Sequence, residues 1–158
     1  MSVIVLAEHA QGAFKKKSLE AVQYAAHIAK AMGTTVTAVA LGNANSSEMQ
    51  ALGAYGAQKV LHVSDARLDE LNSRAYTKAV VAAAQQEGAK VIVCLHDTTG
   101  KAVAPRVAAR LNAGMAAGAV AYPDMSNGFV VKKNVFSGKA FANVKISSDV
   151  KVITLMPN

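Results

Sequence analysis

Apolar residues follow two alternating patterns along the first two thirds of the chain. Short runs rich in Val, Ile and Leu occupy residues 3–8, 35–41, 59–63 and 91–95, and such runs are typical of buried parallel strands. Between these runs, apolar positions recur every three or four residues, as on one face of an amphipathic helix. This spacing predicts helices over residues 18–32, 46–52, 72–87 and 98–111. The alternation of strand and helix predicts a parallel sheet with helices on both faces.

Single residues mark the ends of these predicted helices. We expect Ser18 to open the first one, because a serine is a common helix N-cap. Gly33 and Gly88 directly follow the first and third helices, where a left-handed C-cap residue belongs. Pro105 lies near the predicted start of the fourth helix. We expect it to be tolerated there, because N–H groups of the first turn have no intrahelical acceptor.

The last third of the chain has a different pattern. Residues 116–121, 129–136, 139–146 and 151–155 have the composition of strands, and Asn127-Gly128, Ser137-Gly138 and Ser147-Ser148 lie between them where hairpin turns belong. We therefore expect antiparallel strands that extend or flank the sheet. No linker or repeat interrupts the sequence. The prediction is one domain over residues 1–158, with a three-layer, Rossmann-like α/β fold, a mostly parallel sheet and antiparallel C-terminal strands.

Composition narrows the class of protein. With 158 residues, of which 52% are hydrophobic and 17% charged, the chain can bury a substantial core and is not disordered. No stretch approaches the roughly 20 apolar residues that a membrane span needs, so we predict no membrane insertion. The N-terminus lacks a basic segment, and Glu8 and His9 end its apolar run. These features argue against a signal peptide and predict a cytoplasmic protein.

The net charge of +7 is distributed unevenly. Residues 1–79 carry eight Lys or Arg against six Asp or Glu, whereas residues 80–158 carry nine against four. Nucleic acid or an acidic partner would explain this excess. Aromatic residues do not alternate with the lysines, however, as they do in single-strand binders, so we predict a solvated basic face and no nucleic acid. The excess comes mainly from Lys132, Lys133, Lys139, Lys145 and Lys151.

Several kinds of site lack their sequence signature. The single cysteine, Cys94, excludes an intrachain disulfide and a multi-thiolate zinc site. No two of the four histidines are spaced i, i+4, so we predict no metal. The first loop has one glycine instead of the G-x-G-x-x-G of dinucleotide-binding folds. A P-loop would need glycine at Leu95 and Ser or Thr at Ala102. The helix start at Thr98-Thr99-Gly100 could attract an anion, but an ordinary capped helix is the simpler interpretation.

Polar residues at strand ends form the best internal candidate for a site. Glu8 and Asp97 follow two predicted parallel strands at their carboxyl ends, where open α/β sheets bind ligands. We expect them to share a crevice with His9 and His96. Polar residues occur at strand ends whatever the function, so we predict no catalytic residue and no enzyme. We interpret Cys94 as a core residue and His27 and His62 as structural.

Three segments resemble one family. TTGKAVAPRVAARLNAG (98–114) resembles the G-[KR]-x-x-A-P-R-x-A-A-R-L segment of electron transfer flavoprotein alpha subunits. GAYGAQKVLHVSD (53–65) is similar to a glycine-strand passage of that family, and residues 136–158 are similar to its G-G-K-A strand, closing strand and Arg-Pro hinge. In the last segment Lys139 and Ala140 match, whereas Ser137 and Met156 depart from the pattern. The matching positions of the first segment are Gly100, Lys101, Ala104, Pro105, Arg106, Ala108, Ala109, Arg110 and Leu111.

The resemblance implies a scaffold domain rather than a catalyst. In this family the alpha subunit has an N-terminal domain and a C-terminal domain that binds FAD. This chain is similar to the N-terminal domain, and the flavin-contacting residues are expected beyond Asn158. The resemblance therefore implies no cofactor on this chain alone, a beta-subunit partner in a heterodimer, and flavoprotein dehydrogenases such as acyl-CoA dehydrogenases as electron donors to a bacterial cytoplasmic protein. Arg106 and Arg110, together with the basic C-terminal half, are candidates for subunit contact.

Two other interpretations stay open. The first is a free-standing nucleotide-binding domain of the universal-stress-protein type, with the adenine nucleotide alpha-hydrolase-like fold. Gly53 and Gly56 supply the first pair of its G-x-x-G motif, but the expected third glycine falls on Ala66. The second is a small enzyme that uses Glu8, His9 and Asp97. The position of these residues at strand ends is the only feature that supports it.

Overall fold

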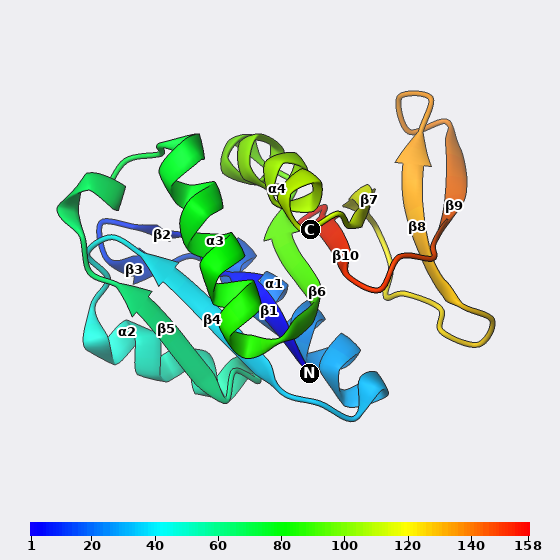
Figure 1. The fold of residues 1–158 in the computed structure, drawn as a ribbon. Coiled ribbons are helices and arrows are strands. Elements are labelled where there is room, and N and C mark those ends of the chain that lie inside the picture. Colours follow the sequence, from blue (N-terminus) through cyan, green and yellow to red (C-terminus); the bar gives the residue numbers. More distant parts are fainter.

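The computed structural model covers residues 1–158, and its centre is one eight-stranded sheet (Figure 1). The strand order is β5-β4-β1-β6-β10-β7-β8-β9. The first six strands in this order are parallel, and β8 and β9 are antiparallel to their neighbours. The predicted α/β fold with a mostly parallel sheet is therefore confirmed. The strands are β1 (Ser2–Leu6), β4 (Val36–Leu41), β5 (Lys59–Val63), β6 (Ala89–Leu95), β7 (Gly114–Ala119), β8 (Phe129–Val135), β9 (Ala140–Ile146) and β10 (Lys151–Leu155).

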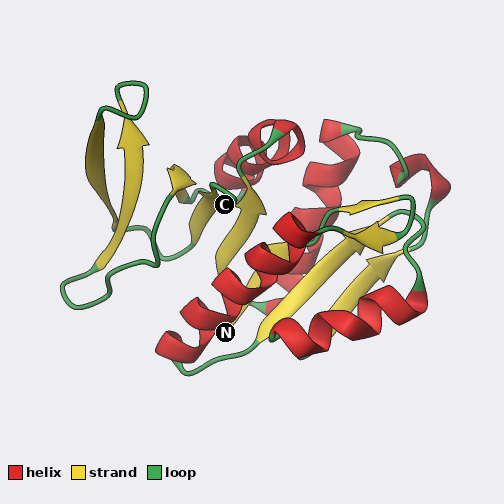
Figure 2. Ribbon diagram, turned by 180° about the vertical axis from the view of Figure 1, so that it is seen from behind, coloured by secondary structure: helices red, strands yellow, loops and turns green.

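Helices cover both faces of the sheet and make three layers (Figures 1 and 2). The helices α1 (Lys16–Met32) and α2 (Ser46–Ala51) lie on one face, and a 3-10 turn (Leu52–Tyr55) continues α2. The helices α3 (Ser73–Glu87) and α4 (Thr98–Arg110) lie on the other face. Gly33 and Gly88 follow α1 and α3 in the left-handed conformation, as predicted. No helix has both the length and the apolarity that crossing a bilayer requires.

The position of β1 at the centre of the sheet explains why its sequence is continuously apolar. Val3 and Val5 belong to the core layer under α1, whereas Ile4 and Leu6 belong to the layer under α3 and α4. All four are at most 2% exposed. Each such side chain contributes about 1.5–3 kcal/mol when it is fully buried. A strand covered on both faces therefore needs apolar residues at every position.

The last strand corrects the prediction for the C-terminal third. β10 lies between β6 and β7 and is parallel to both, so residues 151–155 do not form an antiparallel strand. The strand predicted over residues 116–121 is β7, which is parallel to β10 and antiparallel to β8. Ser147-Ser148 is not a hairpin turn, because β9 and β10 are not paired. Val152 and Ile153 are fully buried in opposite core layers. That continuous burial is typical of an interior parallel strand.

The strands β8 and β9 form a true hairpin that projects from the end of the sheet (Figures 1 and 2). Its turn contains Phe136, Ser137 and Gly138, all with positive φ. This confirms the predicted Ser137-Gly138 turn. β9 is the last strand of the sheet, so one of its backbone edges has no neighbouring strand.

Two local predictions around α1 and α4 are wrong. Pro105 is the eighth residue of α4, well past the first turn, so Lys101 O lacks the amide donor that a non-proline residue would supply. Ser18 lies inside the first turn of α1 rather than before it, and its hydroxyl donates a hydrogen bond to Glu8 O. Part of the expected loop after β1 is a small hairpin of β2 (His9–Ala10) and β3 (Ala13–Phe14).

Candidate functional site

The sheet has a topological switch point between β1 and β6. The chain leaves β1 through α1 toward β4 on one side, and it leaves β6 through α4 toward β7 on the other. Crevices at such points are where open α/β sheets bind ligands, because the two crossovers diverge and leave the strand ends uncovered. Glu8 and Asp97 follow β1 and β6 at this edge, as predicted from the sequence.

A short network of charged groups joins the two strand ends. The Lys17 ammonium lies 2.9 Å from Oδ2 of Asp97. Oδ1 of Asp97 accepts a hydrogen bond of 2.9 Å from the Gly100 amide, which makes Asp97 the N-cap of α4. Asp97 therefore satisfies one free amide of the helix and one cation at once.

Burial and neighbouring groups determine which of the two carboxyl groups carries a proton. Burial, together with the negative charge of Asp97, raises the pKa of Glu8 from 4.5 to about 8. Burial also opposes ionisation of Asp97, but the Gly100 amide and Lys17 outweigh it and hold the pKa of Asp97 below its ordinary value. At neutral pH, Glu8 thus holds the proton and Asp97 holds the charge. Oε2 of Glu8 is buried without a hydrogen-bond partner.

The cavity in front of Glu8 is small and acidic. Its volume is about 140 Å³, and its polar lining includes Glu8, His9, Asp69, Tyr76 and Thr99. Ligand pockets for larger molecules usually measure about 300–1,000 Å³. A phosphate would also meet Asp69 beside Glu8. The dimensions and charge of this crevice therefore do not fit a nucleotide or an FAD.

Two histidines were expected here, and the structure brings only one of them to the crevice. Nδ1 of His9 accepts from the Gly12 amide at 3.2 Å, so Nε2 carries the proton and donates to Leu41 O at 2.6 Å. Two backbone hydrogen bonds thus fix the orientation of the His9 ring. His96 instead hydrogen bonds through Nδ1 to the Thr154 hydroxyl of β10 at 2.9 Å. Glu8 and His9 thus line the crevice, whereas Asp97 lies beside Glu8 without lining it and His96 is directed toward β10.

The other residues singled out from the sequence lie elsewhere. Cys94 is fully buried, and burial raises the pKa of its thiol to about 12, which opposes formation of a reactive thiolate. His62 bonds through Nε2 to Gly42 O at 2.6 Å. His27 is exposed and stacks on Tyr122, with ring centroids 3.7 Å apart. Arg106 is exposed on α4, and its guanidinium donates to Ala102 O at 2.8 Å.

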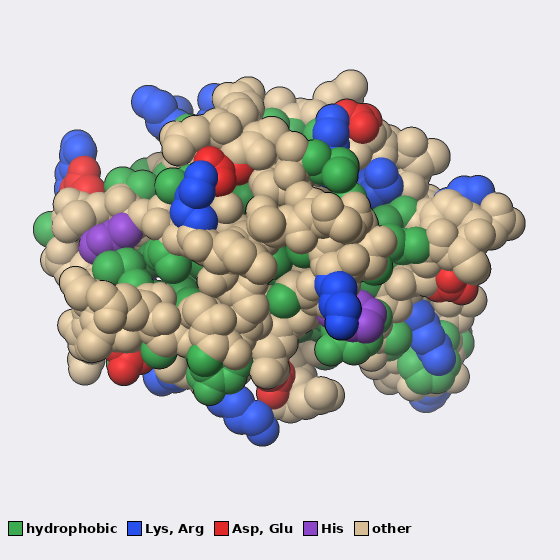
Figure 3. Space-filling model, turned by 90° about the horizontal axis from the view of Figure 1, so that it is seen from below, with side chains coloured by type: hydrophobic (Ala, Val, Ile, Leu, Met, Phe, Trp, Pro, Cys, Tyr) green, Lys and Arg blue, Asp and Glu red, His purple; other side chains and the backbone are tan.

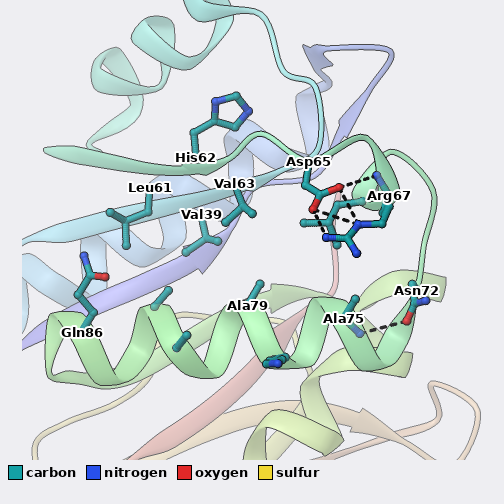
Figure 4. Close-up of a pocket in the computed structure, with 14 residues that line it drawn as sticks. Val39, Leu61, His62, Val63, Asp65, Arg67, Asn72, Ala75, Ala79 and Gln86 are labelled. Atoms are coloured by element: carbon teal, nitrogen blue, oxygen red, sulfur yellow. Dashed lines mark hydrogen bonds and ion pairs between the residues drawn. The ribbon is translucent and has the colours of Figure 1, made fainter.

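Sequence reasoning missed a larger groove of about 600 Å³ between β5 and α3 (Figure 4). Val39, Leu61 and Val63 point toward α3, whereas His62 points away from it (Figure 4). The helix meets these side chains with small residues such as Ala79, so the gap stays unfilled. The groove therefore follows from residue size. In the sequence, several alanines on the inward side of residues 75–83 face an edge strand. This pattern is the signal from which the groove could have been predicted.

Comparison with known proteins connects the chain with one family. A family model described as "Electron transfer flavoprotein domain" matches residues 3–158. The chain is 32% identical over 163 residues to the electron transfer flavoprotein subunit alpha of Bacillus subtilis, covering 99% of this chain and 47% of that protein. It is 30% identical over 144 residues to Protein FixB of Clostridium saccharobutylicum, covering 90% and 43%. The chain thus spans about half the length of the curated relatives it matches.

Among solved structures, a universal stress protein in complex with cAMP superposes with a TM-score of 0.43 at 17% identity. That superposition covers 69% of this chain and 90% of the other.

Proposed function

The chain belongs to the electron transfer flavoprotein domain family, and from this premise we propose that it forms the scaffold domain of an alpha-type subunit. The observation that carries the proposal is the family match over residues 3–158, together with relatives named as alpha subunits. In the complete heterodimer, electrons pass from flavoprotein dehydrogenases through FAD to a downstream acceptor. This domain serves as a scaffold for the other domains of the heterodimer. We place the protein in the bacterial cytoplasm as an electron carrier and not as an enzyme.

The residues of this chain do not fit FAD. The switch-point cavity measures about 140 Å³, which is too small for an FAD, and the Asp69 carboxylate in its lining would repel a pyrophosphate. The groove between β5 and α3 is larger, but its walls are mostly aliphatic and no glycine-rich loop borders it. The flavin of the proposed protein is accordingly held by a separate domain of the alpha-type subunit, and no step of electron transfer is assigned to residues here.

The projecting β8–β9 hairpin supplies a contact surface for a beta-type subunit. Phe136 is 81% exposed and Phe141 is 60% exposed, and the Lys132 ammonium lies 4.2 Å from the Phe141 ring centroid. An open strand edge with large exposed aromatic side chains is a surface that soluble proteins usually cover. α4, which carries Arg106 and Arg110, lies apart from the hairpin (Figure 1), so the subunit contact is assigned to the hairpin and not to these arginines.

The first test is the intact mass and absorbance spectrum of the native protein purified from its source cells. The proposal expects a flavin spectrum and co-purification of a beta-type subunit. A native protein of 16.3 kDa without flavin and without such a subunit would overturn it. The same preparation gives the cell fraction in which the protein occurs.

Variants of the hairpin test the contact itself. Phe136→Asn keeps a residue that tolerates positive φ, and Phe141→Thr keeps a good strand former. We expect the double variant to keep its fold and to lose beta-subunit capture by at least about tenfold. Val63→Thr is the matched control, because Val63 is also exposed on a strand but lies at the opposite edge of the sheet. Equal capture by both proteins would remove the hairpin from the interface.

The nucleotide-binding alternative gains no support from the site geometry. Its phosphates would face the Asp69 carboxylate in the switch-point crevice, and that crevice is too small for a nucleotide. Titration calorimetry with ATP and AMP separates the two functions. Micromolar binding that is altered by Glu8→Gln would favour the nucleotide-binding domain, whereas no detectable heat is expected for the scaffold domain.

A further inference from the structure

A groove between α3 and α4 gathers four cationic side chains. Arg74 and Lys78 come from α3, and Arg106 and Arg110 come from α4. Each pair is spaced i, i+4, so both members lie on one side of their own helix. The groove has a volume of about 810 Å³, and no acidic residue lines it. The sequence had indicated only the two arginines of α4, and helix packing adds the two cations of α3.

These four cations have no counter-charge within the protein. All five salt bridges of the molecule use other cations, namely Lys16, Lys17, Lys59, Arg67 and Lys90. On the face shown in Figure 3, Lys and Arg side chains are scattered, and several lie beside acidic side chains. The groove differs, because four like charges face one space. Like charges held together in this way raise the local potential and attract anions.

We propose that this groove docks an acidic segment of a partner protein, with carboxylates spaced about one helical turn apart. Four charges spread over two helices exceed what one small anion neutralises, and Asp or Glu at i, i+4 would repeat the spacing of the cations. The Arg106 guanidinium already donates to Ala102 O, so the guanidiniums of Arg74 and Arg110 are the ones that can bind carboxylates in a bidentate manner. Lys78 acts as a point charge. The aliphatic stems beside Ala75 and Ala109 give the segment an apolar floor.

The neutral polar groups of the groove argue against a phosphate cradle. Such cradles rely on free backbone amides and hydroxyls. Here the Asn72 side chain already accepts from the Ala75 amide at 3.0 Å. The Thr77 hydroxyl is buried and already donates to Ser73 O at 2.6 Å. Recognition in the groove therefore depends on the exposed cations alone, which suits carboxylates on a protein surface.

This inference does not depend on the proposed function. The groove lies on the face covered by α3 and α4, apart from the β8–β9 hairpin (Figure 1). An acidic segment can thus occupy it while the hairpin is covered by another subunit. Loss of hairpin binding and loss of groove binding are measured with different variants and different probes.

The test uses fluorescence anisotropy with a labelled alanine-based helical peptide that carries Glu pairs at i, i+4. The Gln version of this peptide is the uncharged control. The variants are Arg106→Glu/Arg110→Glu and Arg74→Glu/Lys78→Glu. Lys15→Glu/Lys30→Glu changes the net charge equally with exposed lysines elsewhere and is the matched control. At low salt we expect each groove variant to weaken peptide binding at least about tenfold, and the control to change it only slightly.

Three results would overturn the proposal. The first is an equal loss for the groove variants and the control, which would show attraction by net charge only. The second is undetectable binding of the Glu peptide to the unaltered protein. The third is binding of sodium triphosphate, but not of the Glu peptide, with the same dependence on the four cations. Circular dichroism checks the fold, and Arg106→Gln/Arg110→Gln replaces the charge reversal if that variant is unfolded.

Discussion

The Lys17 ammonium and Oδ2 of Asp97 lie 2.9 Å apart, and this contact links the first turn of α1 to the N-cap of α4. The two helices cover opposite faces of the sheet. Their starts meet at the switch point because β1 and β6 are neighbours that end at the same edge. The Asp97 carboxylate therefore links the helix layers on the two faces of the sheet, through two residues that are 80 positions apart in the chain.

Replacing Asp97 by Ala removes both the cap and the ion pair. We expect the free energy of unfolding to fall by about 1–2 kcal/mol, because the Gly100 amide loses its acceptor and Lys17 loses its partner. Urea unfolding followed by circular dichroism measures the change. Asp97→Asn is the control, since its amide oxygen can still accept from Gly100. An equal loss in both variants would show that the charge of Asp97 matters more than its cap.

Gly100 occupies a position where no side chain fits. A Cβ atom there would overlap the Leu95 carbonyl oxygen and lie 2.7 Å from its carbon, and both are backbone atoms that cannot rotate away. We expect Gly100→Ala to lower the free energy of unfolding by roughly 3 kcal/mol or more, because α4 would have to move off β6. Gly53→Ala is the matched control, with no neighbour within 4 Å and no positive φ. Equal stability of the two variants would show that α4 does not pack this closely against the end of β6.

Pro105 interrupts the hydrogen bonds of α4 on its exposed side. Alanine at this position would supply an amide for Lys101 O and remove the steric conflict of the ring. We expect Pro105→Ala to raise the free energy of unfolding by roughly 1–3 kcal/mol in thermal or urea unfolding. A lower stability would indicate that α4 needs the bend imposed by the proline to pack beside α3.

Local patterns predicted most elements because each strand and helix shows its burial in its own spacing. The place of β10 in the sheet was not predictable in this way. Val152 and Ile153 pair with residues of β6 that lie 60 positions earlier in the sequence. The prediction followed chain order and placed this strand beside β9. Pairing partners of a strand are decided by the whole sheet, and no short pattern records them.

The candidate sites also differ in whether local patterns or only the packing of distant elements could predict them. Glu8 and Asp97 could be predicted because the carboxyl ends of parallel strands share one edge. The groove of four cations could not, because Lys78 and Arg106 meet only through the packing of α3 against α4. Likewise, the departure of His96 toward Thr154 depends on the unexpected position of β10.

Glu8 gives the fold a dependence on pH. Its pKa in the folded protein is about 8 because the carboxyl group is buried beside Asp97, whereas the ordinary value is 4.5. Between these two values the folded protein holds a proton that the unfolded chain has lost. The contribution of Glu8 to stability is therefore complete below about pH 4.5 and is lost as the pH rises through about 8.

Glu8→Gln imitates the protonated side chain and cannot titrate. We expect the unaltered protein to lose stability relative to this variant as the pH rises from about 6 to about 8, by at most about 1.4 kcal/mol per pH unit. His96, whose pKa burial lowers, changes stability with the opposite sign at lower pH, but it is present in both proteins and cancels in the difference. Urea unfolding at several pH values gives that difference directly. Parallel stability curves for the two proteins would show that Glu8 is already ionised in the folded state, which would contradict its raised pKa.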